Sequence, residues 1–248
     1  MATPAARIED LTFSEADFRP LADGASKNPE YNDARLATKR KLADMAKDAV
    51  ARLKASGLEL EQRTSLHNPH QFNGKRVGRL WAYLVRPKKE KARLKKTLGA
   101  DLAKDLDQAY KNAYLCLAIE PDALEVSLRI HVDAWYDGQN MKRRYDSGGE
   151  AELLATLNAL PGFRLRLDNW KGEWICGQLT RESLAEFFKF YTPGEHSLAV
   201  DFRWPAPEGN REFALAAGVP GEMIRALQGL EGLYRWAAWS KESEFLFG

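Results

Sequence analysis

Apolar side chains recur every three or four positions between Leu42 and Leu53, which is the spacing of one face of an α-helix. Pro29 precedes this stretch, and Gly57 follows it as a C-terminal stop signal. The pattern therefore predicts an amphipathic helix from about residue 30 to Ser56, with one face in the core and the other in solvent.

Shorter patterns predict the remaining elements. They are strands at about 58–66, 79–86 and 197–204, a hairpin at 163–179, and helices at 88–113 and from 220 to about 239. Asn73 and Gly74 are expected to supply the positive φ angles of a turn between the first two strands. Gly99 is a candidate break in the helix at 88–113, and Thr180 is a candidate cap for a helix after the second hairpin.

The clearest hairpin runs from Tyr114 to Val132, with Pro121 and Asp122 as its central turn residues. If paired positions sum to 243, Leu117 lies opposite Val126, and the apolar residues of both strands fall on one face. The other face then carries Tyr114, Cys116, Ala118, Glu125, Ser127, Arg129 and His131. This alternation is typical of an antiparallel sheet that is covered on one side.

Roughly seven strands, mostly in hairpins and interleaved with helices, predict an α+β protein with a mostly antiparallel sheet and helices packed on it. A chain of 248 residues with 44% hydrophobic content can bury a large core, so we expect a single α+β domain over residues 1–248. Gly148 and Gly149 mark a candidate subdivision near residues 147–150, between a basic N-terminal half and an acidic C-terminal half.

Charge is distributed unevenly along the chain. Residues 31–100 contain 18 lysines and arginines and 6 acids, an excess of +12 in a chain whose net charge is +2. Such a block is typical of proteins that bind a polyanion or an acidic partner. Membrane-spanning runs and a signal-peptide pattern are not found, so we expect no membrane partner. Cys116 and Cys176 lie in apolar settings, which favours a reducing compartment, the cytoplasm.

The basic excess is densest between Lys75 and Lys96. Cations there follow a glycine turn and flank Trp81 and Tyr83, and a lysine-rich helix comes next. Cations beside aromatic rings suit single-stranded nucleic acid or RNA, because charge meets phosphate and rings stack on bases. We expect phosphate contacts from Lys75, Arg76, Arg79, Arg86, Lys88, Lys89, Arg93, Lys95 and Lys96. A solvated helix and core aromatic residues would give the same pattern.

Two groups of residues are candidates for chemistry. Glu125, His131 and Asp133 share one face of the expected strand and are candidate acid or base catalysts. If the loop after His67 folds over that face, His67 and His70 join His131 and Asp133 as a nitrogen and oxygen site for a divalent metal such as zinc. Many solvated sheet faces carry similar residues, so no cofactor is predicted, and a divalent metal stands as the alternative.

These observations leave three hypotheses open. The first is nucleic-acid binding through the basic segment, with phosphates held rather than bases read. The second is a metal-dependent hydrolase or nuclease that uses the His/Asp cluster, and the third is a module that binds an acidic protein. The sequence has no phosphate-binding glycine loop, Ser nucleophile elbow or Cys-x-x-Cys pair, which disfavours nucleotide hydrolases, lipases and zinc ribbons.

Overall fold

The computed structural model describes residues 8–104, 106–168, 170–207 and 214–247. Within these ranges, seven strands form one antiparallel sheet in the order β1-β2-β3-β4-β7-β5-β6. The strands are β1 (Glu61–Thr64), β2 (Leu80–Val85), β3 (Tyr114–Ile119), β4 (Ala123–Ile130), β5 (Arg164–Leu167), β6 (Glu173–Ile175) and β7 (Leu198–Pro205). The α-helices are α1 (Glu15–Phe18), α2 (Asn32–Ala55), α3 (Lys88–Leu98), α4 (Trp135–Arg144), α5 (Glu150–Asn158), α6 (Arg181–Phe190), α7 (Val219–Gly229) and α8 (Glu231–Ala237). The predicted α+β class is confirmed.

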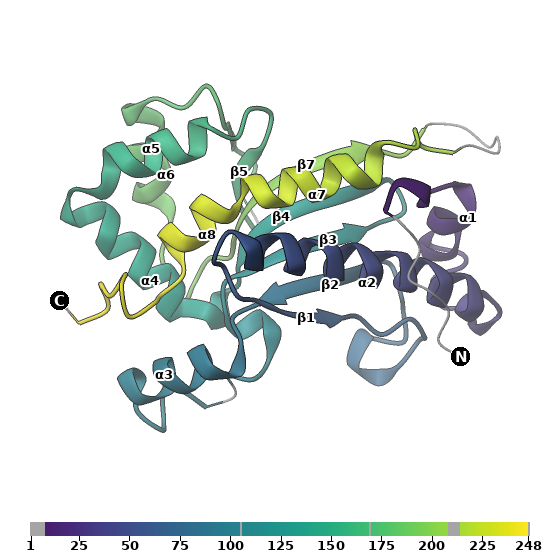
Figure 1. Cartoon of the computed structure of the whole chain (residues 1–248), viewed down its shortest axis with the longest axis horizontal. Coiled ribbons are helices and arrows are strands. Elements are labelled where there is room, and N and C mark those ends of the chain that lie inside the picture. The colour runs from purple at the N-terminus through teal and green to yellow at the C-terminus, as the bar shows by residue number, and fades with distance from the viewer. Residues whose placement is uncertain (1–7, 105, 169, 208–213, 248) are drawn as a thin grey trace.

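Two helices cover one face of the sheet. Figure 1 shows α2 across β1, β2 and β3, and α7 beside it across β3 and β4. The main core lies between these layers, where Leu42 and Met45 of α2, Leu117 and Val126 of the sheet, and Ile224 of α7 are fully buried. Burying each such side chain stabilises the fold by about 1.5–3 kcal/mol, so this face needs the apolar alternation found in the sequence.

A second group of helices, α4, α5, α6 and α8, packs together beside β5 (Figure 1). A single π turn over Tyr145–Gly149 joins α4 to α5, with Gly148 at a φ of 98°. Strands from both sides of this turn lie in the same sheet, because β7 pairs with β4 on one edge and with β5 on the other.

The predicted register of the hairpin at 114–132 is confirmed. Leu117 lies opposite Val126 and Leu115 opposite Leu128, as the sum of 243 requires. The long helix predicted from about residue 30 to Ser56 is also confirmed as α2. In both cases the apolar period matches the period of the element, so the local pattern and the tertiary packing agree.

Three local predictions differ from the structure. The helix expected over 88–113 ends at Leu98: the candidate break at Gly99, which has a φ of 82°, is confirmed, but the α-helix does not resume in the described residues up to 113. The helix expected from 220 to 239 is divided into α7 and α8 at Leu230. In the loop before β2, Gly74 has the positive φ that was expected, but its partner is Lys75 (φ 59°) and not Asn73.

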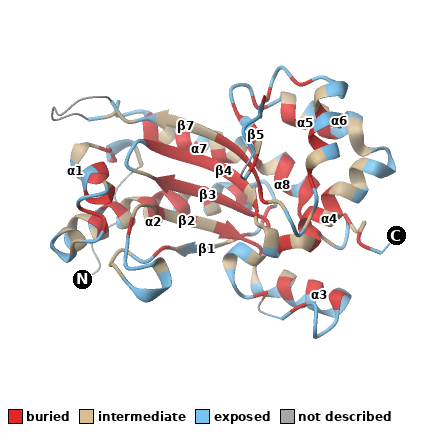
Figure 2. Cartoon of the chain, turned by 180° about the vertical axis from the view of Figure 1, so that it is seen from behind, coloured by how far each residue is buried: buried red, intermediate tan, exposed pale blue. Residues whose placement is uncertain are grey.

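The second face of the sheet is left open over its middle strands. Seen from behind in Figure 2, β2, β3 and β4 have none of the described helices in front of them. We call this face the open face; it carries the partly exposed side chains of Trp81, Tyr83 and Arg129 and the buried side chains of Tyr114 and Glu125. It is the part of the fold where side chains of the predicted basic segment pack beside those of the candidate catalytic strand.

Candidate functional site

Aromatic rings form a row along β2 and β3 on the open face. The ring centroids of Trp81 and Tyr83 are 3.6 Å apart, and those of Tyr83 and Tyr114 are 4.1 Å apart, with both pairs stacked. Residues two apart on a strand point to the same side, which places Trp81 and Tyr83 next to each other. Burial raises the pKa of Tyr83 to about 12, so its hydroxyl stays neutral. Tyr114 is buried, whereas Trp81 and Tyr83 are partly exposed, so the row is an uncharged aromatic cluster with Trp81 at one end.

Arginine side chains surround one buried carboxylate beside this row. Glu125 is 0% exposed, and its Oε1 accepts hydrogen bonds from Arg79 Nη2 at 2.9 Å and Arg129 Nη2 at 2.9 Å. The Ser127 hydroxyl donates to the same oxygen at 2.7 Å, and Arg203 Nη1 lies 3.6 Å from Oε2. The buried carboxylate therefore fixes the positions of the arginines on the open face.

The protonation state of Glu125 follows from these contacts. Burial alone would raise its pKa, but the positive charges of Arg79 and Arg129 and the hydrogen bond from Ser127 lower the pKa to about 2. Glu125 is consequently ionised at neutral pH and poorly suited to exchange protons there. The hydrogen bonds that Glu125 accepts from Arg79 and Arg129 indicate that it holds these two arginines in place.

A pocket of about 310 Å³ opens at the Trp81 end of the row. The loop between β1 and β2 contributes Phe72, which is 91% exposed, and Leu66, which is 44% exposed. Arg76 and Arg79 complete the wall with Trp81. We call it the Trp81 pocket; its volume lies at the lower end of the range of about 300–1,000 Å³ that is usual for small-ligand sites.

The loop that forms the pocket is tied to the rest of the protein. Arg35 Nε donates to the carbonyl of His67 at 2.9 Å, and the amide of Val77 donates to the carbonyl of Ser26 at 2.9 Å. Arg76 also pairs with Asp23. These contacts hold both ends of the loop, so the pocket is preformed. Lys75 keeps a left-handed φ at its tip, a conformation that is uncommon outside glycine and often occurs at functional sites.

The structure separates the nine predicted phosphate contacts into two groups. Lys75, Arg76 and Arg79 lie before β2, and the lysines of α3 lie after it, at the other end of a strand about 20 Å long at roughly 3.3 Å per residue. Lys88, Lys89, Lys95 and Lys96 are exposed, and Arg93, which pairs with Glu90 at 2.8 Å, is exposed as well. The predicted segment is therefore not one continuous surface.

Arg86 corrects the prediction. Its side chain is buried and pairs with Asp137, so it cannot contact a phosphate backbone at the surface. The partner lies on α4, far away in the sequence, and the sequence pattern around Arg86 gave no sign of it.

The candidate catalytic and metal-binding residues do not form one site. His131 Nδ1 lies 3.5 Å from Asp133 Oδ2 and accepts a hydrogen bond from the amide of Asp133, which makes His131 the cap of a short turn after β4. Glu125 lies about 20 Å from His131 along the strand, at roughly 3.3 Å per residue. Glu125 is therefore separated from the other two catalytic candidates, His131 and Asp133.

His67 and His70 lie in the loop and not over β4. Burial and the positive charges of Lys39 and Arg35 lower the pKa of His67, and a cationic neighbourhood disfavours a metal ion. His70 stacks on Phe72, with centroids 5.1 Å apart. Throughout the described ranges, groups of three or more His, Cys, Asp or Glu residues that could hold a metal ion are not found.

Phe72 and Arg63 are site residues that the sequence analysis missed. Phe72 is the one aromatic residue within the polar loop of residues 67–76, which was the available signal. Arg63 is exposed and lies directly opposite Tyr83 in the β1–β2 register. Its place on the open face follows from strand pairing and could not be read from its neighbours in the sequence.

Comparisons with known proteins add no family to this geometry. The chain matches no protein-family model, and no curated protein matches its sequence. Helices capable of spanning a bilayer are not found in the part of the chain that the structure describes.

Proposed function

We propose that this protein binds single-stranded nucleic acid on the open face, with one base in the Trp81 pocket. The observation that carries the proposal is the combination of two accessible rings, Trp81 and Phe72, with the guanidinium groups of Arg76 and Arg79 around one cavity. Bases stack on aromatic rings whatever their sequence, and arginine contacts phosphates. We expect this activity in the cytoplasm, where two buried free thiols remain reduced.

Stacking would supply most of the specificity for single strands. One ring face of Trp81 stacks on Tyr83. Trp81 also lines the pocket, at the end of the aromatic row. A base that enters there meets Trp81 from the sheet and Phe72 from the loop. Base pairs in a duplex do not expose their ring faces, so a duplex would gain only the charge contacts.

Cationic side chains would position the phosphate backbone of the nucleic acid. Arg63 and Lys75 are exposed cations that precede the pocket residues Thr64 and Arg76 in the chain, and Lys75 has a left-handed backbone. With about three phosphates neutralised by these residues and Arg76, the logarithm of affinity should fall with the logarithm of salt concentration with a slope of about −2. The lysines of α3 would make this slope steeper only if the bound nucleic acid extends along β2 as far as α3.

The test is fluorescence anisotropy with a labelled oligonucleotide of mixed sequence, comparing Phe72→Ala with the matched control Phe247→Ala. Phe72 is 91% exposed and Phe247 is 63% exposed, so neither change should unfold the protein. We expect F72A to lose about 1–3 kcal/mol, or about fivefold or more in affinity, and F247A to match the wild type. An oligonucleotide of the same length without bases should bind the wild type and F72A equally.

Three results would refute the proposal. The first is the absence of binding at low ionic strength. The second is an equal loss of affinity in F72A and F247A, and the third is an equal affinity of the wild type for oligonucleotides with and without bases, since either would leave only non-specific charge attraction. Polyglutamate that binds as tightly as the oligonucleotide would instead favour an acidic protein partner over nucleic acid.

A further inference from the structure

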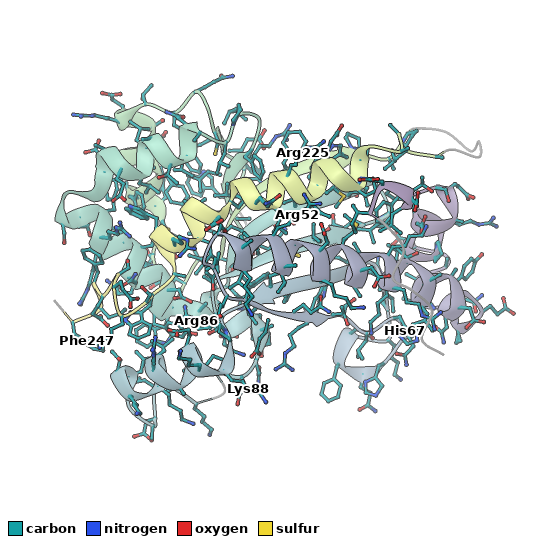
Figure 3. All side chains as sticks on the ribbon, viewed as in Figure 1. Arg52, His67, Arg86, Lys88, Arg225 and Phe247 are labelled. Carbon is teal, nitrogen blue, oxygen red and sulfur yellow. The ribbon has the colours of Figure 1, made fainter. Side chains whose placement is uncertain are left out.

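A cleft of about 560 Å³ lies at the opposite end of β2 from the Trp81 pocket. Its walls come from the segment after α2, the start of α3, α8 and the C-terminal residues 238–243. Figure 3 places Arg86, which is part of the wall, where α3 and the C-terminal segment approach the end of the sheet. The volume is ample for a small molecule.

Arg86 has unused hydrogen-bonding capacity inside this wall. Its side chain is 3% exposed, and Nη2 pairs with Asp137, while Nε and Nη1 have no hydrogen-bond partner. A guanidinium has five N–H bonds, of which Nε carries one and Nη1 two, so three donors are buried without an acceptor. Buried donors without a partner destabilise the folded protein, which makes an acceptor from outside the chain favourable.

Asp137 cannot satisfy those donors. Its Oδ1 already accepts from Arg86 Nη2 and from the amide of Trp239 at 2.8 Å, and its Oδ2 accepts from the amide of Ala113 at 2.6 Å. The carboxylate is thus fixed by three segments of the chain, and it fixes the guanidinium in turn. The ring of Tyr136 lies 5.7 Å from Arg86 Cζ and supports the same orientation. The free donors are therefore preorganised.

We propose that this cleft is a second binding site, which takes a small molecule through a carboxylate group bound by Arg86. The charged residues that line the cleft favour a carboxylate over a phosphate. Arg93 and Arg235 line the cleft, but so do Glu59, Glu90 and Glu242. Such mixed charge disfavours a phosphate with about two negative charges and tolerates a single carboxylate. The apolar side chains of Leu58 and Trp239 would face the rest of the molecule.

The experiment is an NMR titration of the Arg86 Nε–H signal in the intact protein, identified by its loss in Arg86→Lys. R86K keeps a positive charge beside Asp137 and so avoids leaving a buried carboxylate unpaired. Acetate should shift the wild-type signal in a saturable way, and inorganic phosphate at equal ionic strength should shift it less. If acetate leaves the chemical shift of the Arg86 Nε–H signal unchanged, the proposal is overturned.

A second pair of variants keeps the test valid if R86K does not fold. Arg93→Glu places a negative charge on the cleft, whereas Lys96→Glu makes the same change on an exposed residue of α3 that does not line the cleft. R93E should weaken acetate binding by about threefold to fivefold, as expected for a partly solvated charge, and K96E should leave it unchanged. Equal effects of the two variants would show that acetate responds only to overall charge, and the site would be rejected.

Discussion

Replacing Glu125 by Gln tests whether one buried carboxylate organises the open face. The substitution keeps the size of the side chain and removes its charge, while Arg79 and Arg129 remain beside it. The usual pKa of 4.5 falls to about 2 in the folded protein. At about 1.4 kcal/mol for each tenfold change, this difference contributes about 3 kcal/mol to stability at neutral pH. Breaking a buried ion pair by removing one partner costs a similar amount, about 3–5 kcal/mol.

The dependence on pH distinguishes this electrostatic role from simple packing. The folded pKa of Glu125 is lowered, so the unfolded chain binds more protons between about pH 4.5 and pH 2. The contribution is therefore present above about pH 4.5 and is lost as the pH falls through about 2. The cost of E125Q should be about 3 kcal/mol near pH 7 and about half of that near pH 3.

Urea denaturation of the wild type and E125Q at several pH values provides the measurement. Glu173→Gln is a matched control, because Glu173 pairs with Arg164 at 3.3 Å but is 40% exposed. Exposed pairs contribute about 0–1 kcal/mol, so E173Q should change stability little at any pH. A cost of E125Q that stays constant from neutral to acidic pH, or that equals the cost of E173Q, would refute the reasoning.

Three further predictions concern the rest of the fold. Arg35 is fully buried and donates five hydrogen bonds, four of them to backbone carbonyls, so Arg35→Lys should lose about 3 kcal/mol or more in urea denaturation; a loss below about 1 kcal/mol would contradict this. A Cβ added at Gly138 would collide with the Tyr191 hydroxyl, so Gly138→Ala should destabilise by about 1–3 kcal/mol, whereas Gly221→Ala in α7 should be neutral or stabilising in the same thermal scan. Burial raises the pKa of Cys116 to about 11, so its thiol should react with a disulfide reagent only after unfolding, and rapid labelling of the folded protein would show that the site opens.

The elements that could be predicted from the sequence are those in which local pattern and tertiary contact coincide. The β3–β4 register followed from alternating apolar residues, and α2 from a period of three and four. Helices α4 and α5 were not predicted, because glycine is unfavourable inside a helix and Gly148 and Gly149 indicated a boundary. In the structure Gly138 lies inside α4, where it makes room for Tyr191, a residue from the segment after α6. A glycine required by a distant neighbour looks the same in the sequence as one that ends a helix.

The basic block shows the same limit for the site. An excess of +12 over residues 31–100 predicts an exposed cationic surface only if acids from the rest of the chain do not pair with these cations in the folded protein. Arg76 pairs with Asp23, Arg79 with Glu120 and Glu125, and Arg86 with Asp137, all of which lie outside the block. Folding therefore places these three arginines in ion pairs that position their side chains. What remains for ligands is set by unused donors and accessible rings, so the Trp81 pocket and the cleft at Arg86, and not the charge count, are where binding should be sought.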